Sequence, residues 1–279
     1  MKLSKESIAS ILEKGIMNKP IVHYISDITK ASDFAYVVKF FNGKSIMSYG
    51  IEEIHEITAA SNSLLIGLET LDNGKILAME RALRVAKKRG IPVLLDLTGV
   101  NLSLYRKNTA LSFFNRYTID VVRGKSEEIQ AIIRSQKRTR CREKDIKSEY
   151  RDFAIKNKLF LIVESEYYYI TDGYSEFYID NKTKQLNEKV DLDYIFTALL
   201  TMAIGVVENR EERMAALLIS IMSFSICCGL EEEFIKEYNQ KDCFNIEENF
   251  LNNIKNLNAD KMEFLGKISY QFRNKKNNK

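Results

Sequence analysis

The stretch SLLIGLETLDNGKILAMERALRVAKKRGIPVLLDL, residues 63–97, decides the fold class. It begins with an apolar run at 63–68 and ends with another at 91–97, and both have the length of a buried strand. Between them, apolar residues recur at helical spacing from Asn73, a possible N-cap, to Gly90, a stop signal. The stretch therefore predicts a strand–helix–strand unit with both strands parallel in one sheet.

The same alternation continues beyond this unit. Period-two alternation on both sides of Gly173 predicts an antiparallel hairpin at the sheet edge, and from Asp193 onward the pattern is wholly helical. We therefore expect an α/β fold with a central, mostly parallel sheet, helices on both faces and a helical C-terminal part. The further predicted elements are helices at 103–115 and 126–134 and strands at 119–122 and 159–163.

Composition indicates a globular protein. Apolar residues make up 45% and charged residues 29%, and the net charge of +4 demands neither a nucleic-acid nor a membrane partner. We expect one domain over 1–272 and a basic, disordered tail at 273–279. The first residues lack the apolar region of a signal peptide, so a cytoplasmic location is expected. The apolar stretch 215–230 is shorter than the roughly 20 residues of a spanning helix, which predicts a buried core helix.

Charged residues follow two neighbouring predicted strands. Asp96 ends one strand, Arg123 ends the next, and Glu128 lies about one helical turn further on. Because ligands of open parallel sheets bind beyond the carboxyl ends of the strands, these side chains could share one crevice. Two carboxylates suit Mg²⁺, often through water, and a guanidinium suits phosphate oxygens. The same three residues could equally form a structural ion-pair network.

Several segments match known motifs in the same order and at similar spacing. The stretch at 122–129 is similar to I-R-G-N-x-x-E-I, and the one at 90–99 is similar to G-x-P-V-V-L-D-P-V-G. The remaining matches are His23–Asp27 beside V-H-x-I-T-N, Ile46–Ile54 beside V-M-A-x-x-x-E-E-V, Tyr105–Arg106 beside P-[FY]-R, and Phe244–Ile246 beside the end of G-S-F-x-I. Together these segments resemble the hydroxyethylthiazole kinase family of the ribokinase-like superfamily.

This resemblance implies a ribokinase-like fold and an enzyme that uses ATP and Mg²⁺ to phosphorylate the primary alcohol of a thiazole, a thiamine precursor. It implies Asp96 and Glu128 at the metal, Arg123 at the nucleotide and Met47 at the thiazole. The family is usually a homotrimer, so an oligomer through the N-terminal third is expected, with Phe40, Phe41 and Met47 supplying apolar surface.

The phosphate loop departs from the family. The family has G-x-G-C before a long helix, where this chain has Asp191-Leu192-Asp193-Tyr194. Tyr194 then occupies the family's catalytic position, whereas a shift of one residue makes Asp193 the base. The family's nucleotide-side T-G is similarly replaced by Val163–Glu164. Carboxylates and β-carbons in place of glycine amides predict weak or absent ATP binding. The alternative function is therefore an inactive paralogue that binds a small molecule or a partner subunit.

Other candidate residues favour structural roles. His23 and His55 have no nucleophile at a recognisable spacing, and the paired Cys227 and Cys228 suit core filling. The four cysteines lack the paired Cys-x-x-Cys spacing of a zinc site. The tyrosines at 167–169 could stack an adenine, although packing is the simpler interpretation. The basic segment 134–151 could touch nucleic acid or phosphate, but interspersed acids favour a solvated segment.

Overall fold

The computed structural model describes residues 3–136, 145–180, 191–237, 246–266 and 268–272. They share one nine-stranded sheet with the order β2-β1-β3-β4-β5-β6-β7-β8-β9. The strands that run parallel are β1 (Ile21–Ile25), β2 (Lys44–Met47), β3 (Ser63–Gly67), β4 (Val93–Asp96), β5 (Val121–Lys125) and β6 (Phe160–Glu164). The antiparallel strands are β7 (Tyr167–Thr171), β8 (Ser175–Asp180) and β9 (Ile268–Phe272).

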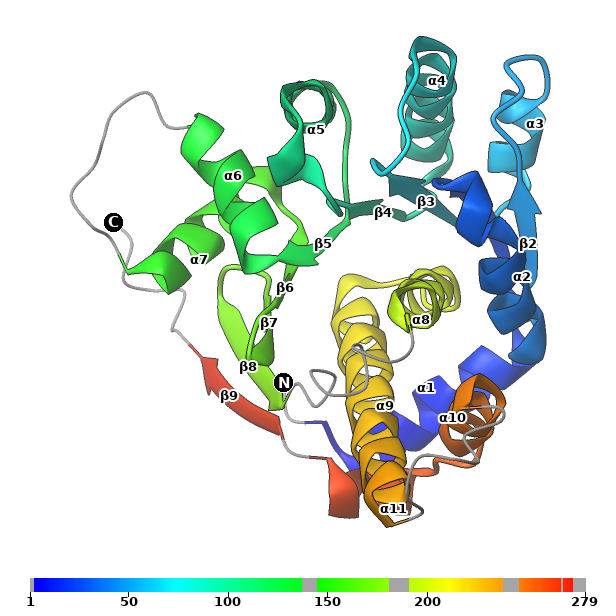
Figure 1. Ribbon diagram of the computed structural model, residues 1–279, viewed down its shortest axis with the longest axis vertical. Helices are drawn as coiled ribbons and strands as arrows, with labels where there is room; N and C mark the ends of the chain where they lie inside the picture. Colours follow the sequence, from blue (N-terminus) through cyan, green and yellow to red (C-terminus); the bar gives the residue numbers. More distant parts are fainter. Residues whose placement is uncertain (1–2, 137–144, 181–190, 238–245, 267, 273–279) are drawn as a thin grey trace.

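Helices cover both faces of the sheet, as the sequence predicts. Figure 1 shows the sheet as an arc with one group of helices along its outer side and α8 and α9 inside it. The outer helices are α3 (Ile54–Ala59), α4 (Asn73–Arg89), α5 (Leu104–Arg116), α6 (Ser126–Gln136) and α7 (Ile146–Asn157). The inner helices are α1 (Lys5–Met17), α2 (Ala31–Phe40), α8 (Asp193–Gly205), α9 (Arg210–Glu237), α10 (Ile246–Lys255) and α11 (Ala259–Leu265).

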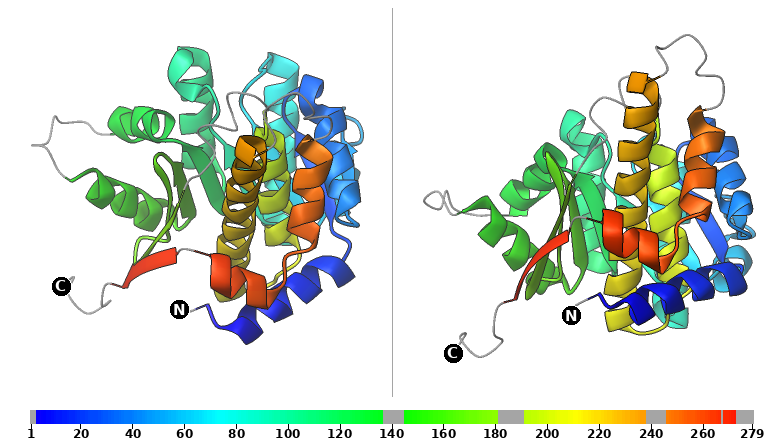
Figure 2. Two further views of the ribbon diagram at one scale, coloured as in Figure 1. Left: turned by 60° about the horizontal axis from the view of Figure 1, so that its bottom comes forward. Right: turned by 90° about the horizontal axis from the view of Figure 1, so that it is seen from below.

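Successive residues of a strand pack alternately into two apolar cores, one on each face of the sheet. In β3, Leu64 and Ile66 pack against the outer helices, whereas Leu65 between them packs against the inner ones. Strands buried on both faces carry continuous apolar runs, and that is why residues 63–68 identify the sheet. The inner core also holds α9, which is long and apolar enough to cross a membrane, but 83% of its apolar window is buried inside the protein. Figure 2 shows α8, α9 and α10 alongside one another, with α1 and α11 at one end of them.

Two local predictions need correction. The side chain that caps α4 is Asp72, which accepts from the amide of Lys75, while Asn73 is the first helical residue. The C-terminal part is not wholly helical, because β9 pairs with β8 and becomes the edge of the sheet outside the predicted hairpin. Four of the five residues of β9 are polar or aromatic, so its pairing partner, rather than an apolar run, selects the strand. The predicted tail at 273–279 lies outside the described residues.

Gly173 lies in the turn of the hairpin between β7 and β8. Its φ of +92° lies in the left-handed region, and a Cβ there would come 2.2 Å from Cγ1 of Ile155. Below the hairpin, Nη1 of Arg151 contacts both carboxylate oxygens of Glu176 at 3.0 Å, and the hydroxyl of Tyr169 donates to the same carboxylate. The turn therefore positions a buried ion pair that fastens α7 to the antiparallel strands.

Two glycine substitutions should move stability in opposite directions. Gly173→Ala should lower the free energy of unfolding by about 2 kcal/mol or more, because it adds backbone strain and a clash with Ile155. Gly15→Ala in α1, where a Cβ meets nothing within 4 Å, should raise it by about 0.5–1 kcal/mol. Urea unfolding of the three proteins measures both effects, and an unchanged midpoint for Gly173→Ala would contradict this account of the turn.

Candidate functional site

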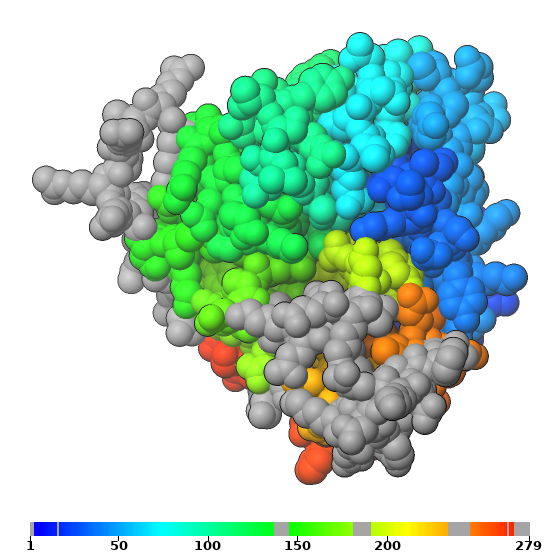
Figure 3. Space-filling model, in the orientation of Figure 1, coloured from blue at the N-terminus to red at the C-terminus, as the bar shows by residue number. Residues whose placement is uncertain are grey.

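The carboxyl ends of the parallel strands form one edge of the sheet, where α8 also begins. The register of the sheet pairs Asp96 of β4 with Arg123 of β5, and Lys125 with Glu164 of β6. Asp96, Arg123 and Glu164 therefore project from the same face, the one that α8 covers. Figure 3 shows the yellow-green start of α8 at the surface beside the dark-blue segment that follows β1. The register thus gathers charged side chains that are far apart in the sequence.

Arg123 is the centre of this edge. It is 1% exposed, and its guanidinium faces three carboxylates. Nη1 lies 3.3 Å from Oδ2 of Asp96, Nε lies 2.9 Å from Oε1 of Glu164, and Nη2 lies 2.7 Å from Oδ1 of Asp193. Nη1 also donates to the hydroxyl of Thr197. The sequence predicts a phosphate-binding arginine here, but each nitrogen of this side chain already faces a carboxylate. Both Nη atoms also donate hydrogen bonds, whereas Nε and Oε1 of Glu164 are close but make no hydrogen bond.

The pKa values of the ionisable groups in the cluster shift in different directions. Although burial opposes it, the carboxylates of Asp193, Asp96 and Glu164 hold the pKa of Arg123 well above its usual value. Burial raises the pKa of Glu164 to about 7; Arg123 opposes this shift, and the nearby carboxylates add to it. Asp193 behaves differently, since Arg123 lowers the pKa of its carboxyl despite burial. Asp193 therefore remains ionised near neutral pH more readily than Glu164.

The N-terminus of α8 contains the altered phosphate loop. Asp193 is the first residue of the helix, and its backbone amide donates to Oδ1 of Asp191 at 3.1 Å. Oδ2 of Asp191 lies 3.0 Å from Nζ of Lys30. A side-chain carboxylate thus sits where a helix N-terminus would hold an external anion. Tyr194 is 8% exposed, and burial raises the pKa of its hydroxyl. Residue 190, the start of the predicted loop, lies outside the described residues.

Asp96 and Glu128, the two predicted metal residues, both lie at this edge. Glu128 accepts from the amides of Gly99 at 2.6 Å and Lys125 at 2.7 Å, and burial raises the pKa of its carboxyl. Oδ1 of Asp96 accepts from the amide and hydroxyl of Thr98, and its Oδ2 faces Arg123. No group of three or more His, Cys, Asp or Glu side chains suited to a metal occurs among the described residues. The pair therefore suits water molecules around a phosphate-bound cation better than direct ligation.

One hollow adjoins the cluster, and a second lies beside the first. A small cavity of about 20 Å³ is lined by Tyr24, Ser26, Lys30, Phe34, Leu65, Glu69, Asp96, Asp193, Tyr194 and Thr197. A wider groove of about 690 Å³ lies beside it and shares Glu69 with it. Met47, the predicted thiazole contact, ends β2 and packs against the inner core, and it lines neither hollow. Tyr49, two residues further on, does line the groove.

The structural interpretations of the other candidates agree with the structure. His23 is fully buried, with Nδ1 3.0 Å from the hydroxyl of Thr58 and Nε2 2.8 Å from the carbonyl oxygen of Ser48. Cys227 and Cys228 are buried in the inner core, and Tyr168 stacks on Phe196. Of the basic segment 134–151, residues 137–144 lie outside the described residues.

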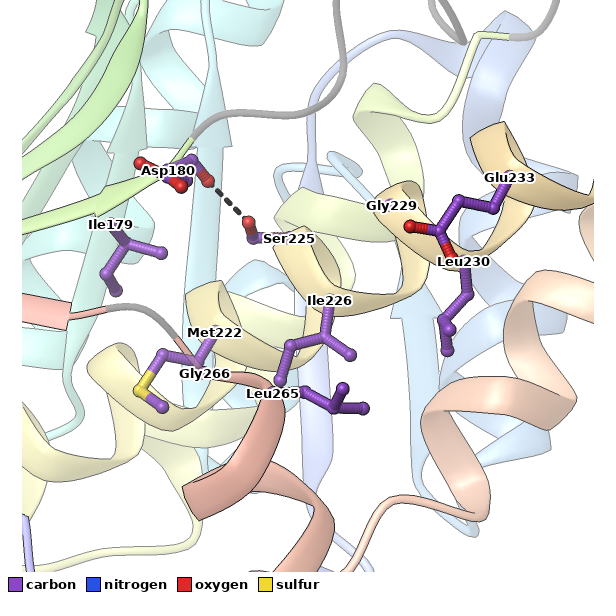
Figure 4. Close-up of a pocket in the computed structure, with 10 residues that line it drawn as sticks. All are labelled: Ile179, Asp180, Met222, Ser225, Ile226, Gly229, Leu230, Glu233, Leu265 and Gly266. Carbon is purple, nitrogen blue, oxygen red and sulfur yellow. Dashed lines mark hydrogen bonds between the residues drawn. The ribbon is translucent and has the colours of Figure 1, made fainter. Parts of the chain in front are cut away.

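A cavity elsewhere in the molecule carries no comparable chemistry. It holds about 100 Å³ between β8, α9 and the end of α11 (Figure 4). Its lining is mainly apolar, and the hydroxyl of Ser225 is already donated to the carbonyl oxygen of Asp180. None of its lining residues belongs to the cluster around Arg123.

Three site residues are not evident from the sequence pattern. Lys30 follows the first strand at the beginning of α2, Thr197 lies one turn into α8, and Glu69 follows β3. Only Glu69 has a usable signal, since an acidic residue directly after a buried strand run belongs to the ligand edge of a parallel sheet. Thr197 reaches Arg123 only because α8 packs across the sheet.

Comparisons with known proteins concern the family and the fold. A profile of the hydroxyethylthiazole kinase family matches residues 12–260. Hydroxyethylthiazole kinase from Clostridium perfringens (strain ATCC 13124) is 23% identical, with 90% of this chain and 97% of the relative covered. The Archaeoglobus fulgidus enzyme is 33% identical over 60% of this chain and 63% of its own. The solved hydroxyethylthiazole kinase from Pyrococcus horikoshii OT3 has a TM-score of 0.81 at 21% identity, covering 95% and 99% of the two chains. A ribokinase-like superfamily protein from Enterococcus faecalis V583 has a TM-score of 0.55 at 11% identity, covering 94% and 95%.

The raised pKa of Glu164 predicts a specific pH dependence of stability. Between about pH 5 and 7 the folded protein keeps this proton while the unfolded chain, with an ordinary value near 4.5, releases it. Stability linked to Glu164 is therefore lost as pH rises through this window. The side chain in Glu164→Gln cannot ionise, so this variant does not lose that stability. Between pH 5 and 8, the difference in free energy of unfolding between the variant and the unmodified protein should shift in favour of the variant by about 1–3 kcal/mol. Parallel urea-unfolding curves across pH would show that Arg123 keeps Glu164 ionised.

Proposed function

The chain belongs to the hydroxyethylthiazole kinase family, and we propose that it is an ATP-dependent kinase of a thiazole-type primary alcohol in thiamine-precursor salvage. The observation that carries this proposal is the position of Asp193. Its carboxylate lies at the N-terminus of α8, is held 2.7 Å from Nη2 of Arg123, and lines the small cavity beyond β1, β3 and β4. A base in this position can meet a hydroxyl that enters from the neighbouring groove.

The reaction needs one proton acceptor and an aligned hydroxyl. The alcohol oxygen attacks the γ-phosphorus of ATP, a new O–P bond forms, and the bond to the β-phosphate oxygen breaks to release ADP. Asp193 takes the alcohol proton. Because Arg123 lowers the pKa of Asp193 and fixes its orientation, the carboxylate is ionised and positioned before substrate arrives. Because this carboxylate is a weak base, Asp193 contributes more by positioning the alcohol than by accepting its proton.

Mg²⁺ belongs to the proposal as the cation that balances the phosphate charge. Asp96 and Glu128 would hold water molecules of its hydration shell, since protein donors already occupy oxygens of both carboxylates. Arg123 would act by orienting Asp96 and Asp193 rather than on the nucleotide itself, because it is 1% exposed. We also propose a cytoplasmic location and a small-molecule substrate, with no nucleic-acid or membrane partner.

A second function, a catalytically inactive paralogue that binds a small molecule or a partner subunit, is favoured by one observation. Two groups that should attract phosphate already have partners within the chain. Arg123 is paired with three carboxylates, and Asp191 accepts the first amide of α8. In this alternative the alcohol binds but no phosphoryl group is transferred.

Asn in place of Asp193 tests the kinase proposal directly. A coupled ADP-release assay with ATP, Mg²⁺ and 5-(2-hydroxyethyl)-4-methylthiazole should show turnover below the ordinary ~10 per second of enzymes. Asp193→Asn should reduce kcat by about 100-fold with little change in KM, since the base acts in the transition state. Asp260→Asn, which loses an exposed pair with Lys5, is the matched control. Alcohol binding without turnover would favour the inactive paralogue.

Removing the charge of Asp191 should open the phosphate site. Asp191→Asn weakens the carboxylate's hold on the Asp193 amide and frees Lys30, so ATP–Mg²⁺ affinity should rise about tenfold. Isothermal titration calorimetry on the unmodified protein, Asp191→Asn and Asp260→Asn measures this. Unchanged affinity in the Asp191 variant would show that the carboxylate does not compete with nucleotide.

A homotrimer is the oligomer that we propose. Phe40, Phe41 and Met47 are half-buried against the inner core, so they offer less free surface than the sequence predicts. The exposed apolar side chains near the groove are Ile28, Leu102 and Leu104, exposed by 63%, 81% and 71%. Sedimentation velocity at micromolar concentration should show a trimer that Leu102→Glu dissociates, whereas a monomeric unmodified protein would contradict the proposal.

A further inference from the structure

The groove beside the Asp193 cavity has the size and walls of a small-molecule site. Its volume of about 690 Å³ falls in the ordinary range for ligand pockets. The rings of Tyr49 and Tyr105 are 45% and 46% exposed there. The hydroxyl of Tyr105 is fixed by donation to Oδ1 of Asn73 at 2.8 Å. The complete lining is Ile28, Tyr49, Glu69, Thr70, Leu71, Asp72, Lys75, Leu102, Ser103, Tyr105 and Arg106.

Lys75 brings a buried positive charge to this groove. It is 5% exposed, and its ammonium donates to the carbonyl oxygen of Ser26 at 2.9 Å and the hydroxyl of Thr70 at 2.8 Å. It also lies 5.4 Å from the ring centroid of Tyr49. None of these partners carries a negative charge, and burial lowers the pKa of Lys75. An ammonium has three donors, so one remains for a ligand.

Arg106 adds a second cation with neutral partners. Its Nη2 donates to the carbonyl oxygen of Glu69 and its Nη1 to that of Gly99 at 3.5 Å. Gly99 has a φ of +73°, and a Cβ there would come 2.2 Å from Nη1 of Arg106. The glycine therefore makes room for the guanidinium as well as for the turn. A guanidinium has five donors, so several remain for a ligand.

The acidic residues of the groove are already engaged. Glu69 lies 3.8 Å from the ammonium of Lys30, and Asp72 accepts the amide of Lys75 as the cap of α4. A buried charge is costly unless a counter-charge meets it. Among the described residues, no carboxylate forms an ion pair with Lys75 or Arg106. Asp27, Asp72 and Glu69 act on Lys75 only from a greater distance. An anionic ligand group would supply the direct partner. The acids at the rim favour a singly charged carboxylate over a doubly charged phosphate.

We propose that the alcohol substrate carries a carboxylate on its ring, with this carboxylate on Lys75 and Arg106 and the ring between Tyr49 and Tyr105. The proposal rests on the proposed kinase function, since it names the substrate class of the same site. Glu69 lines both hollows, so one molecule spans from the two cations to Asp193. Lys75 and Arg106 are binding residues in this arrangement, and Asp193 remains the base.

A matched pair of ligands tests the proposal without nucleotide. The probes are 5-(2-hydroxyethyl)-4-methylthiazole and its 2-carboxylate, titrated into the unmodified protein by calorimetry. The carboxylate should bind about tenfold more tightly or better, as expected for new charge-assisted hydrogen bonds. Lys75→Met should abolish this preference. Lys88→Met, an equal loss of charge at an exposed position of the same helix, should keep it.

Arg106→Gln provides the second arm, which stands even if Lys75→Met fails to fold. It should reduce the preference for the carboxylate several-fold and leave affinity for the uncharged alcohol within about twofold. A preference that survives in Arg106→Gln and in folded Lys75→Met overturns the assignment. Equal or weaker binding of the carboxylate by the unmodified protein overturns the inference, while binding of the uncharged alcohol leaves the kinase proposal standing. Binding of neither compound overturns both.

Discussion

A single buried guanidinium organises this edge of the molecule. Arg123 leaves β5 at the point where β4, β6 and α8 all present a carboxylate, and it contacts all three. An unpaired charge at this depth would be strongly destabilising, so Asp96, Glu164 and Asp193 must stay close to it. The ring of Phe196 covers the guanidinium at 5.3 Å. The position of α8 over the sheet, and with it the candidate base, therefore depends on this contact.

The same contact sets the chemistry of the site. A guanidinium surrounded by carboxylates fixes the orientation of Asp193, and its own charge is met within the protein. Asp191 has a parallel effect at the start of α8, because it occupies an amide that could otherwise meet an external anion. Burial at this edge, together with the neighbouring carboxylates, raises the pKa of Glu164 to about 7 although Arg123 opposes the shift. The charged groups at this edge are thus paired within the protein, whereas in the neighbouring groove Lys75 and Arg106 form no ion pair with any described residue.

Much of the fold follows from periodicity. The apolar runs at 63–68 and 91–97 predict parallel strands because strands buried on both faces need apolar residues at every position. The hairpin around Gly173 follows from its alternation and its turn. The strand β9 has no such signal, since its pairing with β8 comes from chain segments almost a hundred residues apart. Likewise, Asp72 rather than Asn73 caps α4, a difference of one residue that propensity alone does not resolve.

The sequence by itself determined the fold class, the family resemblance and the presence of Asp96 and Arg123 near the carboxyl ends of two strands, with Glu128 in the helix that follows, because these depend on local patterns along the chain. Only the tertiary structure decided what those residues do. Arg123 meets Glu164 and Asp193 through sheet register and the packing of α8, and both are long-range relationships with no local signature. Lys75 is an ordinary helical lysine in the sequence, and its burial beside an open groove depends on how α4 sits against the ends of β1 and β3. Local patterns fix which residues reach the edge, whereas partners and burial, which set charge and availability, exist only once distant segments pack.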